Sequence, residues 1–307
     1  MEKIYIFGHK NPDTDSITSS LVMANLETKL GNPVEACALG TPNKETEFVL
    51  NYLGIEAPRV LEENEIPEGA NVILVDHNNP EESIANLEQV NILKVIDHHC
   101  IKVSTPYPLY YRAEPVGCTE TILYELYQEN GVEIDKKIAT LMLSAIISDT
   151  LLLKSPTCTE KDVKVVKELA KIAEIEYESY GLEMLKAGTD LSSFSIEEIL
   201  NLDAKQVSLK EVKTIINQVN TASIPEVMKS KADLEAGMER IIAEKGLDLF
   251  MLLITDIVNS NSQVIALGKA ANLVEKSYGV KLVDHTALLE GVVSRKKQVI
   301  PIMTENA

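Results

Sequence analysis

The chain has 307 residues, of which 45% are hydrophobic and 25% charged, a composition typical of globular proteins, and its length predicts two domains. Acidic residues outnumber Lys and Arg by 47 to 29. The resulting net charge of −18 argues against a nucleic-acid partner and favours bound cations. No apolar run reaches the roughly 18 residues of a membrane helix. Residues 1–7 show no secretory pattern, so we expect a cytoplasmic protein without a membrane partner.

Strands and helices alternate in the first part of the chain. Residues 16–30 and 43–53 have helical periodicity, and each segment is followed by a glycine that can end a helix. Four short apolar runs bounded by polar residues are typical of buried parallel strands: residues 3–7, 34–39, 71–75 and 92–96. Strands joined by helices predict a doubly wound, mainly parallel α/β sheet.

The pattern becomes helical from residue 119 to residue 186. Residues 139–147 are apolar almost all round and predict a buried helix, with Asp149 just beyond it. Small polar residues predict a linker at 188–194, between an N-terminal domain (1–187) and a C-terminal domain (195–307). In the second domain we expect a smaller α/β fold with a helix at 224–244 and strands at 204–208, 211–219, 247–255 and 263–267.

Acidic and histidine side chains follow three of the predicted strands of the first domain. In chain order they are His9, Asp13 and Asp15; then Asp76 and His77; then Asp97, His98 and His99. Ligands of open α/β sheets bind outside the carboxyl ends of the strands, so we expect these side chains to converge in space. Asp149, beyond the buried helix, could complete the set.

Carboxylates and imidazoles without thiolates suit Mn²⁺, Co²⁺, Fe²⁺ or Zn²⁺. Two such ions, roughly 3.5–4 Å apart, can share and deprotonate one water that attacks phosphorus. Asp13 and Asp15 could reach different ions, and Asp76 could bridge both. Taken alone, an Asp after a strand is usually a turn former. The coincidence at three strand ends favours a metal site.

For His77 three alternatives stay open: orienting Asp76, contacting phosphate or facing solvent. We assign His285 to the surface.

A basic segment, residues 294–298, stands out in this acidic chain. Its apolar flanks resemble the start of a strand, in which Arg295 and Lys297 would face one side and Lys296 the other. Charged runs are usually solvated. Beside a pair of metal ions, however, such cations would bind a phosphate. Lys205 is ambiguous from pattern alone, and a surface position is its default.

Four motifs carry a family resemblance: residues 8–16 (GHKNPDTDS), 76–78 (DHN), 97–99 (DHH) and 294–298 (SRKKQ). With these motifs in order, the whole chain resembles the family II inorganic pyrophosphatases of the DHH phosphoesterase superfamily, in the form without a regulatory insert. The resemblance implies an active site in a cleft between two α/β domains. It also implies a homodimer formed through the N-terminal domain.

The resemblance further implies roles for individual residues. One metal ion is held by His9, Asp13 and Asp76, and the other by Asp15, Asp76, His98 and Asp149, so that Asp76 bridges. His99 contacts the substrate and assists the transfer, while Lys205, Arg295 and Lys296 bind the terminal phosphates. The implied cofactors are two Mn²⁺ ions per subunit, with Co²⁺ as an alternative, and Mg²⁺ accompanying the substrate. The implied reaction is that of an inorganic diphosphatase, in which a metal-bridging hydroxide splits pyrophosphate into two phosphates.

Two other functions compete with this interpretation. Other DHH phosphoesterases cleave oligoribonucleotides, cyclic dinucleotides or 3′-phosphonucleotides, and they typically carry a GGGH-like segment. This chain has no Gly-Gly dipeptide, no Trp and only 5% aromatic residues, so it offers few platforms on which bases can stack. A non-catalytic metal- or phosphate-binding regulator on the same fold is expected to lack a ligand, and none is missing. Phosphate release from pyrophosphate separates these functions.

Overall fold

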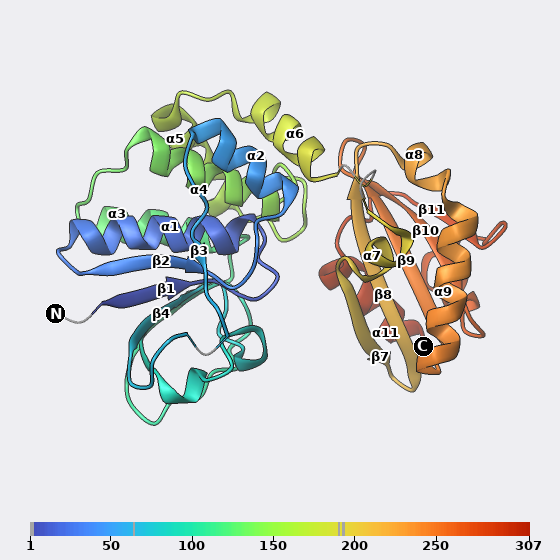
Figure 1. Cartoon of the computed structure of the whole chain (residues 1–307). Coiled ribbons are helices and arrows are strands. Elements are labelled where there is room, and N and C mark those ends of the chain that lie inside the picture. Colours follow the sequence, from blue (N-terminus) through green and yellow to red (C-terminus); the bar gives the residue numbers. More distant parts are fainter. Residues whose placement is uncertain (1–2, 64, 190, 192–193) are drawn as a thin grey trace. The chain divides into compact units, whose positions relative to one another are not determined.

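The structure is a computed structural model that describes residues 3–63, 65–189, 191 and 194–307. The chain divides into two compact units, Met1–Ala187 and Gly188–Ala307, each described by itself (Figure 1). Three residues of the predicted linker (190, 192 and 193) lie outside the described residues. In the described part of the chain, no helix combines the length and the apolar character needed to cross a membrane.

The N-terminal unit is built on a parallel sheet of six strands. Its strands are β1 (Ile4–Phe7), β2 (Val34–Ala38), β3 (Arg59–Val60), β4 (Asn71–Val75), β5 (Asn91–Asp97) and β6 (Tyr110–Ala113). Its helices are α1 (Thr14–Lys29), α2 (Lys44–Leu53), α3 (Thr119–Glu129), α4 (Lys136–Asp149), α5 (Glu160–Ala173) and α6 (Tyr177–Gly188), with 3-10 turns η1 (Pro80–Glu82) and η2 (Leu87–Gln89).

The strand order, β3-β2-β1-β4-β5-β6, reverses its direction of progress at β1. Because crossovers between parallel strands are right-handed, strands added on either side of β1 require connections on opposite faces. Helices α1 and α3 pack on one face, where Figure 1 shows the helices of this unit gathered. Connecting segments cover the other face through Ile66, Leu87 and Val103. The prediction of a parallel α/β domain is confirmed, with turns and loops in place of helices on the second face.

Two predicted helices of this unit agree with the structure in different degrees. Helix α4 is the buried helix expected from its all-round apolar sequence, and its residues 138–147 are all buried. Helix α1 begins at Thr14, two residues earlier than expected, because the Asp13 side chain accepts a hydrogen bond from the Ser16 N–H and caps the helix. Asp15 therefore lies within the first turn of the helix.

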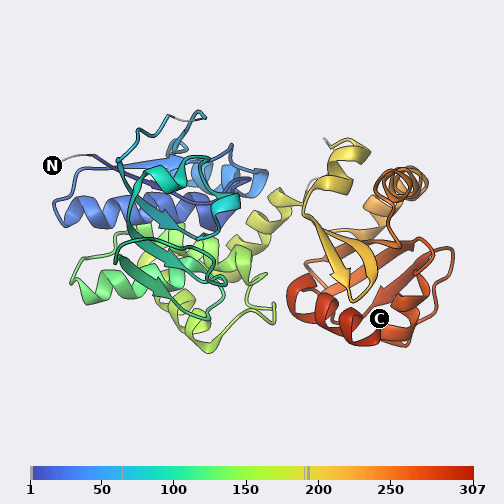
Figure 2. The same cartoon turned by 90° about the horizontal axis from the view of Figure 1, so that it is seen from below.

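The C-terminal unit is a smaller α/β domain with a mixed sheet in the order β11-β10-β9-β8-β7, in which β8 and β9 are parallel. Its strands are β7 (Ala204–Leu209), β8 (Val212–Thr221), β9 (Leu249–Asp256), β10 (Asn261–Leu267) and β11 (Thr286–Leu289). Its helices are α7 (Ile196–Asn201), α8 (Ile224–Met228), α9 (Lys231–Lys245), α10 (Asn272–Tyr278) and α11 (Ile300–Asn306), with a π-helical turn η3 (Arg295–Val299). Helices α9 and α11 lie on opposite faces of this sheet (Figure 2), so every residue of β9 is buried.

Two expectations for this unit were wrong. The single helix expected at 224–244 is divided into α8 and α9, because Ser230 leaves helical geometry with a ψ of 12° and its carbonyl accepts the first hydrogen bond of α9 from Leu234. The basic segment is not the start of a strand but the π-helical turn η3. The Ser294 hydroxyl caps this turn by accepting the Lys297 N–H, and the Gln298 side chain accepts the N–H groups of Val293 and Ser294. Local side-chain acceptors thus satisfy the backbone donors that a strand would pair.

Candidate metal centre

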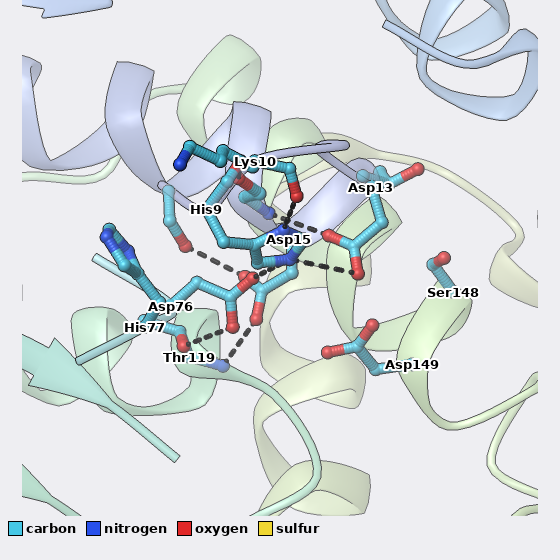
Figure 3. A network of polar contacts seen from close by, with 12 residues as sticks. His9, Lys10, Asp13, Asp15, Asp76, His77, Thr119, Ser148 and Asp149 are labelled. Carbon is cyan, nitrogen blue, oxygen red and sulfur yellow. Dashed lines mark hydrogen bonds and ion pairs between the residues drawn. The ribbon is translucent and has the colours of Figure 1, made fainter. Parts of the chain in front are cut away.

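Six of the residues selected from the sequence lie together in the N-terminal unit and form what we call the candidate metal centre: His9, Asp13, Asp15, Asp76, His98 and Asp149. Figure 3 shows all of them except His98 as labelled side chains. They follow the neighbouring strands β1, β4 and β5 or belong to α1 and α4. Their ligand atoms form two groups, His9 with Asp13 and Asp76, and Asp15 with His98 and Asp149, and a third group joins Asp76 and His98 to His99. Within each group all ligand atoms lie within 4.8 Å of one another. The reversal of strand order at β1 therefore brings distant parts of the sequence to one place.

The turn from β1 into α1 positions the first carboxylates. Gly8 allows the end of β1 to lie close to α1, because a Cβ atom on Gly8 would lie 2.1 Å from Ser16 Oγ. Asp13 Oδ2 lies 3.6 Å from His9 Nε2. Asp15, two residues further along the chain, points elsewhere, because its two oxygens accept the Ser19 hydroxyl and the Thr119 N–H, both at 2.8 Å. The two aspartates thus serve different groups of ligand atoms.

Asp76 lies between the two groups. It follows β4 in the left-handed conformation, with a φ of 58°, which Asp tolerates better than most residues. Its Oδ1 accepts the Thr119 hydroxyl at 3.1 Å and lies 3.4 Å from His98 Nε2, while its Oδ2 lies 3.4 Å from His9 Nε2. Oδ2 is buried and accepts no hydrogen bond from the described part of the chain. Each oxygen of this carboxylate therefore faces a different histidine.

Both histidines present an unprotonated nitrogen to the centre when the ring is neutral. His9 Nδ1 lies 2.7 Å from the Lys10 carbonyl, and His98 Nδ1 lies 3.1 Å from the Val116 carbonyl. A carbonyl can only accept, so Nδ1 carries the hydrogen in each ring and Nε2 keeps its lone pair. Metal-binding histidines are oriented in this way. The donor set of imidazole nitrogens and carboxylate oxygens suits Mn²⁺, Co²⁺, Fe²⁺ or Zn²⁺.

Charge accumulates in the centre. Burial, reinforced by the nearby Asp76, raises the pKa of Asp15 to about 7, and burial together with Asp15 raises the pKa of Asp149 well above its usual value. Burial lowers the pKa of His9, but Asp13 and Asp76 outweigh it and raise this pKa to about 12. Protons or cations must offset this concentration of carboxylates, so divalent ions are a fitting occupant.

Asp149 is the last residue of α4, and the chain bends away from the helix in an unusual manner. Leu151, Leu152 and Leu153 have φ values of 46°, 54° and 64°, which place three bulky residues in the left-handed region. Such a conformation costs about 1–2 kcal/mol per residue. Thr150 holds the bend, since its hydroxyl accepts the Leu153 N–H. Strain of this kind is typical of functional sites.

His99 lies at the edge of the centre and is oriented by Asp97. The buried Asp97 Oδ1 accepts both the backbone N–H and the ring Nδ1–H of His99, at 3.0 and 2.9 Å. Asn78 donates to the other Asp97 oxygen at 2.5 Å. The His99 side chain is 43% exposed, so its Nε2 is available to a ligand.

His77 has a different place. Its ring is buried, Nδ1 donates to the Val75 carbonyl at 2.9 Å, and Nε2 accepts the Ser83 hydroxyl at 3.0 Å. The solvent-facing alternative is therefore wrong. Both ring nitrogens form hydrogen bonds that hold the segment after β4 in place.

The cations selected in the second domain lie in the C-terminal unit. The Arg295 side chain is only 13% exposed, and its guanidinium donates to the Asp203 carboxylate at 2.8 Å and to the carbonyls of Asp203 and Ile216. Lys205 is the β-sheet partner of Ile216, which brings it to the same part of the unit. Lys296 is exposed on η3. His285 is on the surface as expected, where it contacts Glu235.

The sequence did not reveal the roles of several residues that hold the candidate metal centre together. Thr119, the first residue of α3, donates its N–H to Asp15 and its hydroxyl to Asp76, across 104 and 43 residues. Asn78 and Asp97 belong to the quoted motifs, but only the structure shows that they orient His99. The one local signal for Thr119 was its position at the start of a helical segment.

Comparisons with known proteins agree with this geometry. Residues 3–146 match the family model described as "DHH family, N-terminal domain", and residues 182–306 match "DHHA2 domain". The chain is 57% identical to a probable manganese-dependent inorganic pyrophosphatase of Brevibacillus brevis, over 99% of this chain and 98% of that protein. It is 55% identical to the manganese-dependent inorganic pyrophosphatase of Bacillus subtilis, over 99% of each chain. A crystal structure of a putative family II inorganic pyrophosphatase from Methanococcus jannaschii superposes with a TM-score of 0.80 at 39% identity, covering 99% of each chain.

Proposed function

The chain belongs to the manganese-dependent, or family II, inorganic pyrophosphatases of the DHH family, and from this premise we propose how its residues hydrolyse pyrophosphate to two phosphates. The candidate metal centre would hold two divalent cations, one at His9, Asp13 and Asp76 and the other at Asp15, Asp76, His98 and Asp149.

One observation carries this proposal. The two oxygens of Asp76 each lie 3.4 Å from the Nε2 atom of a different histidine, and a separate set of aspartates accompanies each histidine. A single ion would use one such set. Two sets with one buried carboxylate that faces a histidine of each are the arrangement expected for a pair of ions.

The side chains of the centre have distinct tasks in this proposal. When bound, the two cations would lower the pKa of a water molecule to near neutrality and offset the charge of the phosphoryl oxygens. Thr119 fixes Asp15 and Asp76, so the ligands need little rearrangement when the ions bind. His99, held by Asp97 through Nδ1, presents Nε2 to the substrate and assists the transfer.

Arg295, Lys205 and Lys296 bind the terminal phosphates of pyrophosphate. An arginine suits this task because its planar donors match phosphate oxygens in pairs. Asp203 restrains the guanidinium of Arg295, which lowers the entropy lost when the substrate binds.

The cofactors and assembly extend the proposal. We propose two Mn²⁺ ions per subunit, with Co²⁺ as an alternative and Mg²⁺ accompanying the substrate. We also propose a homodimer formed through the N-terminal domain, in which β6 offers an open sheet edge with Tyr110 45% exposed. A cytoplasmic location and the absence of a nucleic-acid partner stay predictions from the sequence.

Phosphate release tests the proposed function. Pyrophosphate, a 3′-phosphonucleotide and a dinucleotide are offered to the protein with Mn²⁺ and, separately, with Mg²⁺ alone. We expect rapid release from pyrophosphate with Mn²⁺ and little from either nucleotide. A preference for a nucleotide would assign the chain to another DHH phosphoesterase, and no release from any substrate would indicate a binding protein.

A further inference from the structure

Glu45 is a carboxylate that none of the motifs contains and that the mechanism leaves unused. It lies in the first turn of α2 and is partly buried. Its Oε1 atom accepts the Thr14 hydroxyl at 2.9 Å and also accepts the Ser148 hydroxyl. One oxygen thus joins two segments that lie 134 residues apart in the sequence.

The two segments carry three of the six side chains of the candidate metal centre. Thr14 stands between Asp13 and Asp15 at the start of α1, and Ser148 immediately precedes Asp149 at the end of α4. Thr46, also on α2, supports the same contact, because its hydroxyl lies 3.0 Å from that of Thr14. Helix α2 is therefore attached to both segments from the side.

The ion site that contains Asp15 and Asp149 needs such an attachment. Asp15 and Asp149 belong to the same group of ligand atoms, and two like charges close together repel each other. The strained bend after Asp149 leaves the end of α4 without a continuing helix to restrain it. A link between the residues beside Asp15 and Asp149 opposes their separation.

We propose that Glu45 is a positioning residue that sets the spacing of Asp15 and Asp149, and through them the position of the cation that they hold relative to the other cation; this inference rests on the proposed two-ion function. A carboxylate suits the task because one charged oxygen accepts two hydroxyl donors in short, strong hydrogen bonds. Removal of a partner that orients a metal ligand typically lowers metal affinity by about 10- to 100-fold.

The test compares variants by metal binding rather than by turnover alone. Mn²⁺ is titrated into metal-free protein, and the electron paramagnetic resonance signal of the loaded protein is recorded, because the coupling between two Mn²⁺ ions depends on their separation. We expect Glu45→Ala to lower the affinity for the ion held by Asp15 and Asp149 by about tenfold or more and to change the coupled signal. Glu45→Gln keeps an acceptor oxygen, so it should fall between wild type and Glu45→Ala.

Two further variants separate position from charge and from folding. Ser148→Ala removes one hydrogen bond and keeps the Glu45 charge, so it should lower the affinity for the same ion. The double variant Glu45→Ala/Ser148→Ala should lower that affinity little further than Glu45→Ala alone. Glu47→Gln, on the same helix but exposed and paired with Lys44, is the matched control and should match wild type. If Glu45→Ala does not fold, Ser148→Ala carries the test.

The outcomes distinguish the two proposals. Folded Glu45→Ala and Ser148→Ala proteins with wild-type Mn²⁺ affinity and coupled signal would overturn the role of Glu45 and leave the proposed function intact. A wild-type protein that binds fewer than two Mn²⁺ ions, or shows no coupled signal, would instead overturn the two-ion function.

Discussion

Replacing Asp76 with Asn tests the arrangement of the candidate metal centre most directly. The change keeps the shape of the side chain and removes one negative charge from a position that is 1% exposed. Since the carboxylate faces both groups of ligand atoms, the loss should affect both ions. Asp149→Asn, by contrast, changes one group and should weaken mainly one ion.

The magnitude follows from the distances. Each Asp76 oxygen lies 3.4 Å from the imidazole nitrogen that marks one ion site. A unit charge at that distance, with an effective dielectric constant of about 20, interacts by about 5 kcal/mol per unit of opposing charge. His9 and His98 are partly exposed, which weakens the interaction. We therefore expect each Mn²⁺ dissociation constant to rise by about three orders of magnitude.

The assay is a titration of metal-free protein with Mn²⁺, in which the resonance signal of the free aqueous ion reports the unbound fraction. Asp76→Asn should show neither of the two binding steps with a dissociation constant in the micromolar range or below. Its phosphate release should fall below detection. Two ions bound with wild-type affinity, or the loss of one step with the other unchanged, would refute the bridging role of Asp76.

Three more outcomes follow from other parts of the molecule. Arg295→Ala should raise the KM for pyrophosphate by about 10- to 100-fold, since a charged hydrogen bond is worth about 1.5–3 kcal/mol, whereas Lys297→Ala should change KM little. Gly8→Ala places a Cβ atom where the first turn of α1 lies, so it should lower the free energy of unfolding in urea by about 1–3 kcal/mol and weaken Mn²⁺ binding. The raised pKa values of His9, about 12, and His98, about 9, mean that both rings are protonated at pH 7 without metal. Mn²⁺ binding should therefore release protons, measured by calorimetry in buffers of different ionisation enthalpy, and its affinity should rise with pH.

Contrary results would be equally informative. Equal KM values for Arg295→Ala and Lys297→Ala would remove the basic turn from substrate binding. An unchanged urea midpoint for Gly8→Ala would show that β1 and α1 need no such close approach. Mn²⁺ affinity independent of pH between 6 and 9 would mean that protons do not compete with the ions at the two histidines.

The sequence by itself determined the class of the first domain and the selection of its reactive side chains. Apolar runs bounded by polar residues predicted β1, β4 and β5 as buried parallel strands, and parallel strands present their carboxyl ends at one edge of the sheet. Residues that directly follow these strands, such as His9 and Asp76, therefore had to approach one another. A local pattern suffices for this inference because the geometry of a parallel sheet supplies the long-range part.

Only the tertiary structure decided how those side chains are held. Thr119 contacts Asp15 across 104 residues, and Glu45 contacts Ser148 across 103, so no local pattern reports either contact. The basic segment shows the same limit, because its apolar flanks suit a strand, yet the hydrogen bonds of Ser294 and Gln298 close it into a π-helical turn. Sequence periodicity reflects which side of an element is buried, whereas the partners of individual polar groups depend on which elements the folded chain places side by side.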